Sequence, residues 1–256
     1  MPRPLIALGV AAIVAVLLVS CASEPTPQPP SAPTPRASVG PSGNGVLRIG
    51  TAFPATDSSI GPAQVAGVEV AVREINEAGG VLGVPVQVFH RASGENGSDQ
   101  LTASFTNLQG MSIDVFIGPT ASGAADSVLV AATDAHIPIV VPSRDATGDG
   151  YLFYLPVPAV GAQSIGLPAE PDDAFAARLR MSDPGVTDLR YALEAYDAVI
   201  IAALAAILAG DDGGASIAAN IASVMADGIA CTSFGQCLDV LETEPDIAYG
   251  ASIAQP

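Results

Sequence analysis

The sequence contains no lysine and no tryptophan, and its nine arginines are outnumbered by 26 acidic residues. The formal net charge is −17 at pH 7. A nucleic-acid-binding protein needs a basic surface to neutralise phosphates, and this chain has the opposite charge balance. An anionic membrane surface would also repel so acidic a protein. We therefore expect no nucleic-acid partner and no membrane attachment through charge.

Motifs that carry enzymatic or cofactor chemistry are also missing. The chain has no Gly-x-Gly-x-x-Gly fingerprint, no phosphate-binding loop and no His-Glu-x-x-His zinc motif. His90 and His136 fall in a predicted strand and at a helix-to-strand junction, which favours structural roles. Asp134 and His136 are too few ligands for a metal site, and Ser122 lacks the surroundings of a nucleophile elbow. We expect no enzymatic activity, no bound metal and no cofactor.

Cysteine is scarce, and the first of the three cysteines follows an N-terminal apolar run. Arg3, an uncharged apolar stretch at residues 5–19 and small residues before Cys21 are the parts of a cleavable signal peptide. The stretch is too short, and the following sequence too polar, for a permanent membrane span. Residues 18–21 resemble the bacterial lipobox, which implies removal of a signal peptide at residues 1–20 and lipidation of Cys21. The alternative is an ordinary signal peptide with an incidental cysteine.

Residues 22–45 are rich in proline, serine and threonine, a composition that favours an extended tether. Together with Cys21 they form a predicted lipidated tether at residues 21–45, followed by a folded domain at residues 46–256. The expected location is the extracytoplasmic face of the cell membrane, with the lipid as the sole anchor. In that oxidising compartment Cys231 and Cys237, six residues apart, are expected to form a disulfide.

From residue 46 onward, short β-branched runs alternate with longer helical patterns. This alternation predicts βαβ units and an α/β fold with a parallel sheet flanked by helices. The expected strands are residues 46–53, 84–91, 113–117, 137–141 and 151–155. The expected helices are residues 62–78, 98–108 with Ser98 as N-cap, 121–135, 173–180, 188–209 and 216–227, with a short helix near the disulfide. The apolar part of helix 188–209 is too short to cross a bilayer, which predicts a buried helix.

Two of the predicted strands run directly into loops rich in hydroxyl groups. Thr120 and Ser122 follow the strand at residues 113–117 and stand where a helix N-cap is expected, and a loop at residues 142–147 follows the next strand. Ligands of parallel α/β sheets bind at the carboxyl edge, and a helix N-terminus there favours a carboxylate. Asp145 in the second loop would suit an ammonium group. The alternative is that these hydroxyls only cap helices and turns.

Several segments together resemble one protein family. Residues 62–83 are very similar to the first helix of the leucine/isoleucine/valine-binding type of periplasmic binding protein. Further segments that look like landmarks of this family follow in the same order at residues 90–94, 117–123, 137–143, 193–199, 231–238 and 246–252. The resemblance implies a type I periplasmic-binding-protein fold, an amino acid or similar small ligand and an ABC permease as partner. It places ligand contacts at Ala121, Ser122, Ser143 and Thr147.

The chain departs from the family pattern in its middle. Family members build a second α/β lobe between segments that resemble residues 151–155 and 191–209, but only about 35 residues separate these segments here. The resemblance therefore implies a single lobe, with weak binding because closure of two lobes normally excludes water. The leading hypothesis is a solute-binding lipoprotein of a branched-chain amino-acid transporter, reduced to one lobe. The alternative is a sensory or interaction lipoprotein that uses the lobe as a scaffold.

Overall fold

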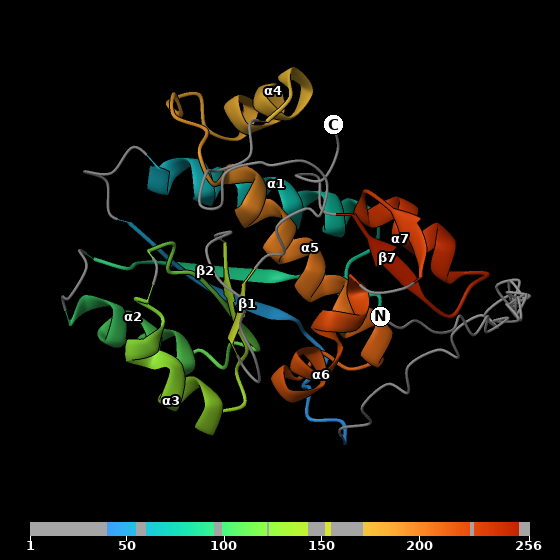
Figure 1. Ribbon diagram of the computed structural model, residues 1–256, viewed down its shortest axis with the longest axis horizontal. Helices are drawn as coiled ribbons and strands as arrows, with labels where there is room; N and C mark the ends of the chain where they lie inside the picture. The colour runs from blue at the N-terminus through green and yellow to red at the C-terminus, as the bar shows by residue number, and fades with distance from the viewer. Residues whose placement is uncertain are drawn as a thin grey trace, which may run out of the picture. The chain divides into compact units, whose positions relative to one another are not determined.

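The computed structural model describes residues 40–54, 60–94, 99–121, 123–142, 152–154, 171–225 and 228–250. The described strands form a five-stranded parallel sheet of order β2-β1-β3-β4-β5 and a two-stranded parallel sheet of β6 and β7 (Figure 1). The strands are β1 (Arg48–Phe53), β2 (Gln87–Ala92), β3 (Val115–Ile117), β4 (Ile139–Val141), β5 (Leu152–Tyr154), β6 (Ile229–Cys231) and β7 (Ile247–Tyr249). The helices are α1 (Ile60–Glu77), α2 (Gln100–Gln109), α3 (Asp126–Asp134), α4 (Asp173–Ser182), α5 (Ala192–Ala209), α6 (Gly214–Val224) and α7 (Phe234–Leu241).

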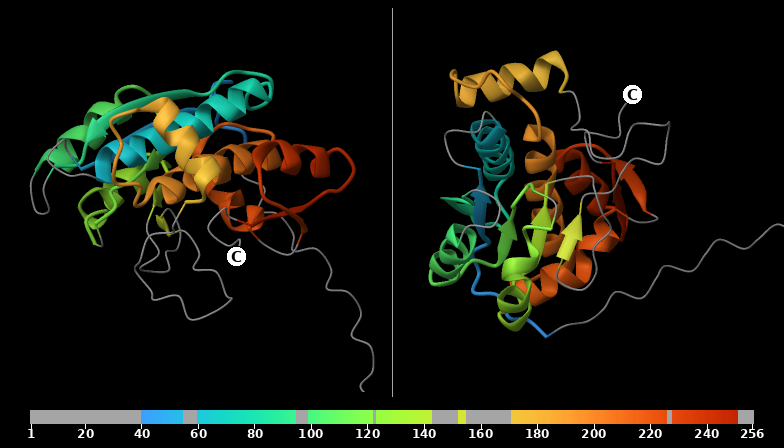
Figure 2. Two further views of the ribbon diagram at one scale, coloured as in Figure 1. Left: turned by 90° about the horizontal axis from the view of Figure 1, so that it is seen from above. Right: turned by 60° about the vertical axis from the view of Figure 1, so that its left-hand side comes forward.

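Helices cover both faces of the larger sheet. Helices α1 and α5 lie on one face and helices α2 and α3 on the other (Figures 1 and 2). Side chains of β1 alternate between these layers: Ile49 and Phe53 join the core with α1 and α5, whereas Ala52 joins the core with α2 and α3. The predicted α/β fold with a parallel sheet flanked by helices is confirmed.

The α1–α5 pair forms the centre of the larger core. Gly67 of α1 lies against the backbone carbonyl of Ala192 at the start of α5, and a Cβ atom at Gly67 would collide with that carbonyl oxygen. Within the part of the chain that the structure describes, α5 is the one helix long and apolar enough to cross a membrane, but 83% of it is buried inside the fold. The prediction of a buried helix is confirmed.

Each strand of the larger sheet begins one to three residues later than predicted, and the starts of several helices also differ from the prediction. Helix α3 begins at Asp126, five residues after the predicted start, because Gly123 adopts a φ of 71°, outside the helical region. Helix α2 begins at Gln100 with Asp99 at the N-cap position, so the prediction of Ser98 as N-cap is wrong. Tyr191, with a φ of 63°, delays the start of α5 in the same way.

The C-terminal segment contains two strands that the sequence did not reveal. Strands β6 and β7 have the sequences Ile-Ala-Cys and Ile-Ala-Tyr. Neither lies in a longer β-branched run like those that indicated β3 and β4. The short helix expected near the cysteines is α7. A disulfide with an S–S distance of 2.03 Å joins Cys231 of β6 to Cys237 of α7, so it ties the strand to the helix that follows.

Two aspartates between α5 and α6 hold the beginning of the fold. The Asp211 carboxylate accepts hydrogen bonds from the backbone N–H groups of residues 42 and 43 at 3.0 and 2.9 Å. The Asp212 carboxylate accepts from the N–H groups of residues 44–46 at 2.9–3.1 Å. Contacts with the domain therefore begin at Ser42, within the predicted tether.

Candidate functional site

The carboxyl edge of the larger sheet contains a topological switch point. The chain runs from β1 to β2 on one side and then to β3 on the other side of β1. The ends of β1 and β3 therefore diverge, and ligands of open α/β sheets bind in the crevice at such a point. Gly118, directly after β3, has a φ of 111°, and a Cβ there would collide with the backbone carbonyl oxygen of Ala52 in β1. Only glycine allows the loop after β3 to lie this close to β1.

A buried hydrogen bond ties this loop to helix α1. Gln64 Nε2 donates to Thr120 Oγ1 at 2.5 Å, and both side chains are buried. Gln64 Oε1 is buried without a hydrogen-bond partner among the described residues. The switch point thus has a fixed loop and one buried acceptor that a ligand or water donor could satisfy. Sequence reasoning assigned Thr120 to a helix cap and missed Gln64, because their pairing depends on the approach of α1 to the loop.

One predicted site residue lies at this edge within the described residues. Ala121 is partly exposed directly after Thr120, and its carbonyl accepts a hydrogen bond from the N–H of Ala124 at 3.1 Å. The other predicted ligand-binding residues, Ser122, Ser143 and Thr147, lie outside the described residues, as does the predicted lipidation site Cys21.

The predicted helix N-terminus at Thr120 and Ser122 is wrong. Ala125 occupies the N-cap position of α3 and makes no side-chain cap hydrogen bond. The N–H groups of Ser127 and Val128 donate to the carbonyls of Ala124 and Ala125 within the turn. Asp126 adds a negative charge to the first turn, which disfavours an anion there. The N-terminus of α3 is therefore not the group that would bind a carboxylate at this edge.

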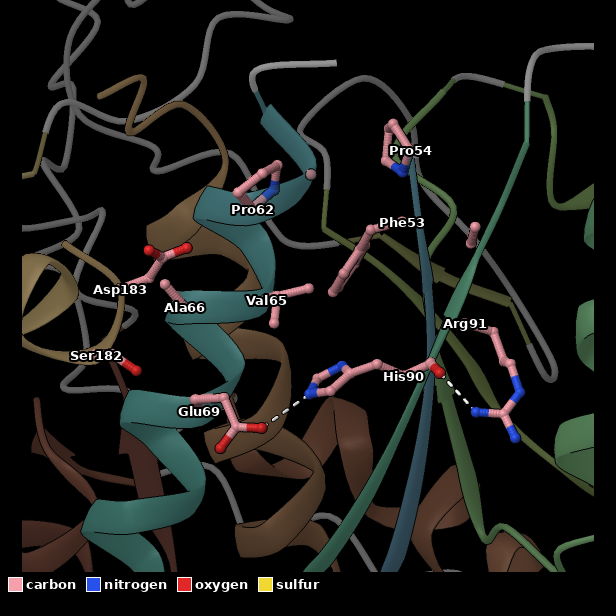
Figure 3. Close-up of a pocket in the computed structure, with 12 residues that line it drawn as sticks. Phe53, Pro54, Pro62, Val65, Ala66, Glu69, His90, Arg91, Ser182 and Asp183 are labelled. Atoms are coloured by element: carbon pink, nitrogen blue, oxygen red, sulfur yellow. Dashed lines mark hydrogen bonds and ion pairs between the residues drawn. The ribbon is translucent and has the colours of Figure 1, made fainter. Parts of the chain in front are cut away.

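A pocket of about 570 Å³ opens beside the switch point, on the α1 face of the sheet (Figure 3). The pocket extends over helix α1. The ends of β1 and β2 lie on one side of it, and the end of α4 lies on the other. Its lining residues are Phe53, Pro54, Gly61, Pro62, Val65, Ala66, Glu69, His90, Arg91, Ala92, Ser182 and Asp183. The sequence did not reveal this pocket, because its lining comes from segments that are far apart in the chain. The spacing of residues 62, 65, 66 and 69 nevertheless marks one helical face.

A hydroxyl, an imidazole and a carboxylate are aligned at the wall of the pocket. Thr51 Oγ1 lies 2.7 Å from His90 Nδ1, and His90 Nε2 lies 2.9 Å from Glu69 Oε1. A carboxylate only accepts, so Nε2 donates to Glu69, and in the tautomer protonated at Nε2 the Nδ1 atom accepts from the Thr51 hydroxyl. Hydrolases use groups in this order, but Thr51 lies in β1, an interior strand, with 0% exposure and cannot reach a substrate. The alignment therefore fixes His90 rather than activating a nucleophile.

The charge that faces the pocket is negative. Arg91 directs its guanidinium away, with Nε donating to Asn107 Oδ1 and Nη1 donating to the His90 carbonyl, each at 2.7 Å. Glu69 and Asp183 remain as the formal charges on the lining. In the described part of the chain, no group of three or more His, Cys, Asp or Glu side chains is placed to hold a metal ion.

Comparison with known proteins finds the same parallel α/β fold in other binding proteins. Residues 48–169 match the family model for periplasmic binding proteins, whereas no curated protein matches the sequence. The branched-chain amino-acid transporter substrate-binding protein LivJ from Streptococcus pneumoniae, solved with isoleucine, aligns with a TM-score of 0.56 and 17% identity, over 71% of this chain and 89% of its own.

Two further solved structures show the same similarity. An ABC transporter substrate-binding protein from Desulfitobacterium hafniense, in complex with leucine, has a TM-score of 0.52 and 15% identity, over 69% of this chain and 88% of its own. A fatty acid ABC transporter substrate-binding protein from Thermomonospora curvata has a TM-score of 0.54 and 12% identity, over 71% and 82%. The matched segment 48–169 spans β1 to β5 and contains the switch point. This segment is similar to periplasmic binding proteins, and the chain has a type I-like fold of the kind found in branched-chain amino-acid substrate-binding proteins.

Proposed function

We propose that the protein is an extracytoplasmic solute-binding lipoprotein of a branched-chain amino-acid type ABC transporter, reduced to one lobe. The observation that carries this proposal is the switch point between β1 and β3, which lies inside the segment that matches the family model. The loop after β3 is fixed there by Gly118 and by the Gln64–Thr120 hydrogen bond. Ala121 and Ser122 follow directly and supply the proposed ligand contacts, with Ser143 and Thr147 from the loop after β4.

The path of the chain between β5 and α4 supports a single lobe. Strand β5 ends at Tyr154 and helix α4 begins at Asp173. At α4 the chain already packs against α1, because Arg178 Nη1 donates to Glu74 Oε2 of α1 at 3.0 Å. Arg178 also lies over the rings of Phe175 and Tyr196, at 5.1 and 5.6 Å from their centroids. Residues 155–172 alone are too few for a second α/β lobe.

Features at both ends of the sequence support an exported lipoprotein. The proposed signal peptide and Cys21 precede the fold, and the disulfide between Cys231 and Cys237 suits an oxidising compartment. The function is binding rather than catalysis, since the aligned Thr51, His90 and Glu69 have no accessible nucleophile. An ABC permease is the proposed partner, and the lipid is the proposed membrane attachment.

Isothermal titration calorimetry tests the proposal directly. All described contacts lie within residues 40–250, so the chain from residue 22 onward keeps them. We expect binding of a branched-chain amino acid with a Kd in the millimolar range, about what half a cleft provides. Ser122→Ala should weaken binding about tenfold or more by removing a hydrogen bond to the ligand carboxylate. The control is Ser127→Ala, which removes an exposed hydroxyl bonded only to the Ala124 carbonyl.

The alternative role is a sensory or interaction scaffold. One observation favours it: the first turn of α3 holds Asp126 and internally bonded N–H groups, so α3 does not offer an anion-binding terminus at this edge. If no amino acid in a full panel binds to the folded chain, ligand binding by this lobe is refuted and the scaffold role takes its place.

A further inference from the structure

We propose that the pocket across helix α1 is a second binding site, specific for a small organic ammonium ion with an apolar body. This site is separate from the loops at the switch point. Ala121 is absent from its lining, and Gln64, which holds the loop after β3, is absent as well. The proposal therefore does not depend on whether the loops at the carboxyl edge bind an amino acid.

The size and walls of the pocket fit a ligand of this kind. Its volume of about 570 Å³ lies within the range of about 300–1,000 Å³ typical of small-molecule sites. Most of the lining is apolar and comes from three elements, namely β1, α1 and β2. The apolar lining residues are Phe53, Pro54, Pro62, Val65, Ala66 and Ala92. In Figure 3 the side chains of Phe53 and Val65 point toward one another from the strand and the helix, and they would enclose the apolar body.

The polar groups of the pocket favour a cation. Glu69 lies on α1, and Asp183 lies directly after α4. Glu69 uses Oε1 for His90, and among the described residues its Oε2 makes no hydrogen bond. Asp183 accepts one bond, from the Gly185 N–H at 2.8 Å, and a carboxylate accepts several. Both groups can therefore accept N–H donors from a ligand.

No basic side chain in the lining offsets these two carboxylates. The Arg91 guanidinium is bonded to Asn107 and to the His90 carbonyl, away from the pocket. The His90 ring has one nitrogen bonded to Thr51 and the other to Glu69. The Ser182 hydroxyl, which accepts from Arg73 Nη2 at 3.4 Å, is a neutral donor in the lining. A carboxylate ligand would thus meet two like charges and a neutral hydroxyl, whereas an ammonium would meet two charged acceptors beside an apolar wall. The pocket should therefore discriminate strongly by charge.

The test compares three probes of similar shape: 2-phenylethylamine, 3-phenylpropionate and 2-phenylethanol. Titrations of the chain from residue 22 at pH 7 should show chemical-shift changes at Val65, Ala66 and Ala92 with the amine. We expect the alcohol to bind about fivefold more weakly and the carboxylate to cause no saturable shifts. Equal binding of amine and carboxylate would refute the proposal, as would shifts located elsewhere or no binding of the amine.

Two substitutions assign the effect to the pocket. Glu69→Gln keeps an acceptor for His90 Nε2 and removes the charge, and Asp183→Asn removes the second charge. Each should weaken amine binding about threefold to fivefold, whereas Glu77→Gln, an exposed change on the same helix, should leave it unchanged.

If Glu69→Gln unfolds the chain, Asp183→Asn alone decides, since it lies in a loop outside the core. Unchanged amine affinity in Asp183→Asn would overturn the assignment. Ser122→Ala must not alter amine binding, which separates this site from the proposed amino-acid site.

Discussion

At the scale of single residues, buried polar groups hold the two edges of the sheet. At the carboxyl edge Gln64 donates to Thr120. At the opposite edge an oxygen of Asp114 accepts a hydrogen bond from the Arg48 N–H at 2.8 Å. Such partners are separated by tens of residues, and no sequence pattern links them. This is why the sequence indicated the hydroxyl-rich loop after β3 but not the residue that fixes it.

The Thr120 contact leads to a prediction about stability. Thr120→Val keeps the shape of the side chain but removes the acceptor for Gln64 Nε2 and leaves a buried donor unpaired. We expect the free energy of unfolding in urea to fall by about 1–3 kcal/mol. Thr106→Val on α2 is the matched control, because the Thr106 hydroxyl is exposed and bonds only to the Thr102 carbonyl. Equal losses in the two variants would contradict a structural role for the Gln64–Thr120 pair.

Asp114 should make stability depend on pH. Burial raises the pKa of Asp114 from 3.8 to about 7; the Arg48 N–H opposes this shift, and the Asp212 and Asp211 carboxylates add to it. Between pH 3.8 and about pH 7, Asp114 keeps its proton in the folded state but has released it in the unfolded state. The stability contributed by protonated Asp114 is thus complete below about pH 4 and is lost as pH rises through 7, a change of roughly 3–4 kcal/mol.

Asp114→Asn isolates this contribution, because asparagine keeps an acceptor for the Arg48 N–H and carries no charge. Urea unfolding at pH 4.5 and pH 8 should show a smaller decline in the free energy of unfolding for the variant than for the wild type. The same decline in both proteins would show that Asp114 titrates normally in the folded state.

At the scale of elements, the alternation of strands and helices was visible in the sequence, but several element ends were not. Short β-branched, apolar runs predicted the five strands of the larger sheet. Strands β1, β3 and β4 are almost fully buried, whereas the edge strand β2 is partly exposed. The start of α3 depends on the left-handed conformation at Gly123, and the start of α5 on that at Tyr191. Backbone conformations of this kind follow from tertiary contacts as well as from residue type. Among the described strands, β6 and β7 pair with each other alone, and neither lies in a β-branched run like those of β3 and β4.

The packing of α1 against α5 can be tested at one position. In Gly67→Ala the added Cβ would collide with the backbone carbonyl of Ala192. Two packed helices cannot give way as a flexible side chain would, so we expect a loss of about 1–3 kcal/mol or more in the free energy of unfolding. Gly235→Ala in α7 is the control, since nothing lies within 4 Å of a Cβ there. That change should be neutral or stabilise by up to about 1 kcal/mol. A tolerated Gly67→Ala would contradict the close approach of the two helices.

At the scale of the whole molecule, a compact binding lobe is proposed to follow a lipidated tether. The fold begins at Ser42, where Asp211 and Asp212 bind the backbone of residues 42–46. This contact sets the position at which a tether from the membrane would enter the domain. The sequence indicated the tether by composition, but the aspartates that end it lie about 170 residues further along the chain.

Membrane attachment should depend on Cys21. Cys21→Ala removes the site of lipidation, and the acyl chains are the proposed attachment. In cell fractionation we expect the variant either in the soluble fraction or at the size of the unprocessed precursor. A variant that is processed and fractionates with membranes like the wild type would refute the lipoprotein assignment.

The most direct test of the single-lobe binding site is chemical-shift mapping with the chain from residue 22 and millimolar leucine, isoleucine or valine. The proposed site predicts saturable shifts that cluster at residues 118–123, at the end of β3 and beside Gln64. Ser122→Ala should abolish or greatly weaken these shifts while the rest of the spectrum stays unchanged, because a surface hydroxyl contributes only about 1 kcal/mol to stability. Shifts that persist in Ser122→Ala, or the absence of saturable shifts at residues 118–123 with any amino acid, would contradict ligand binding by this lobe.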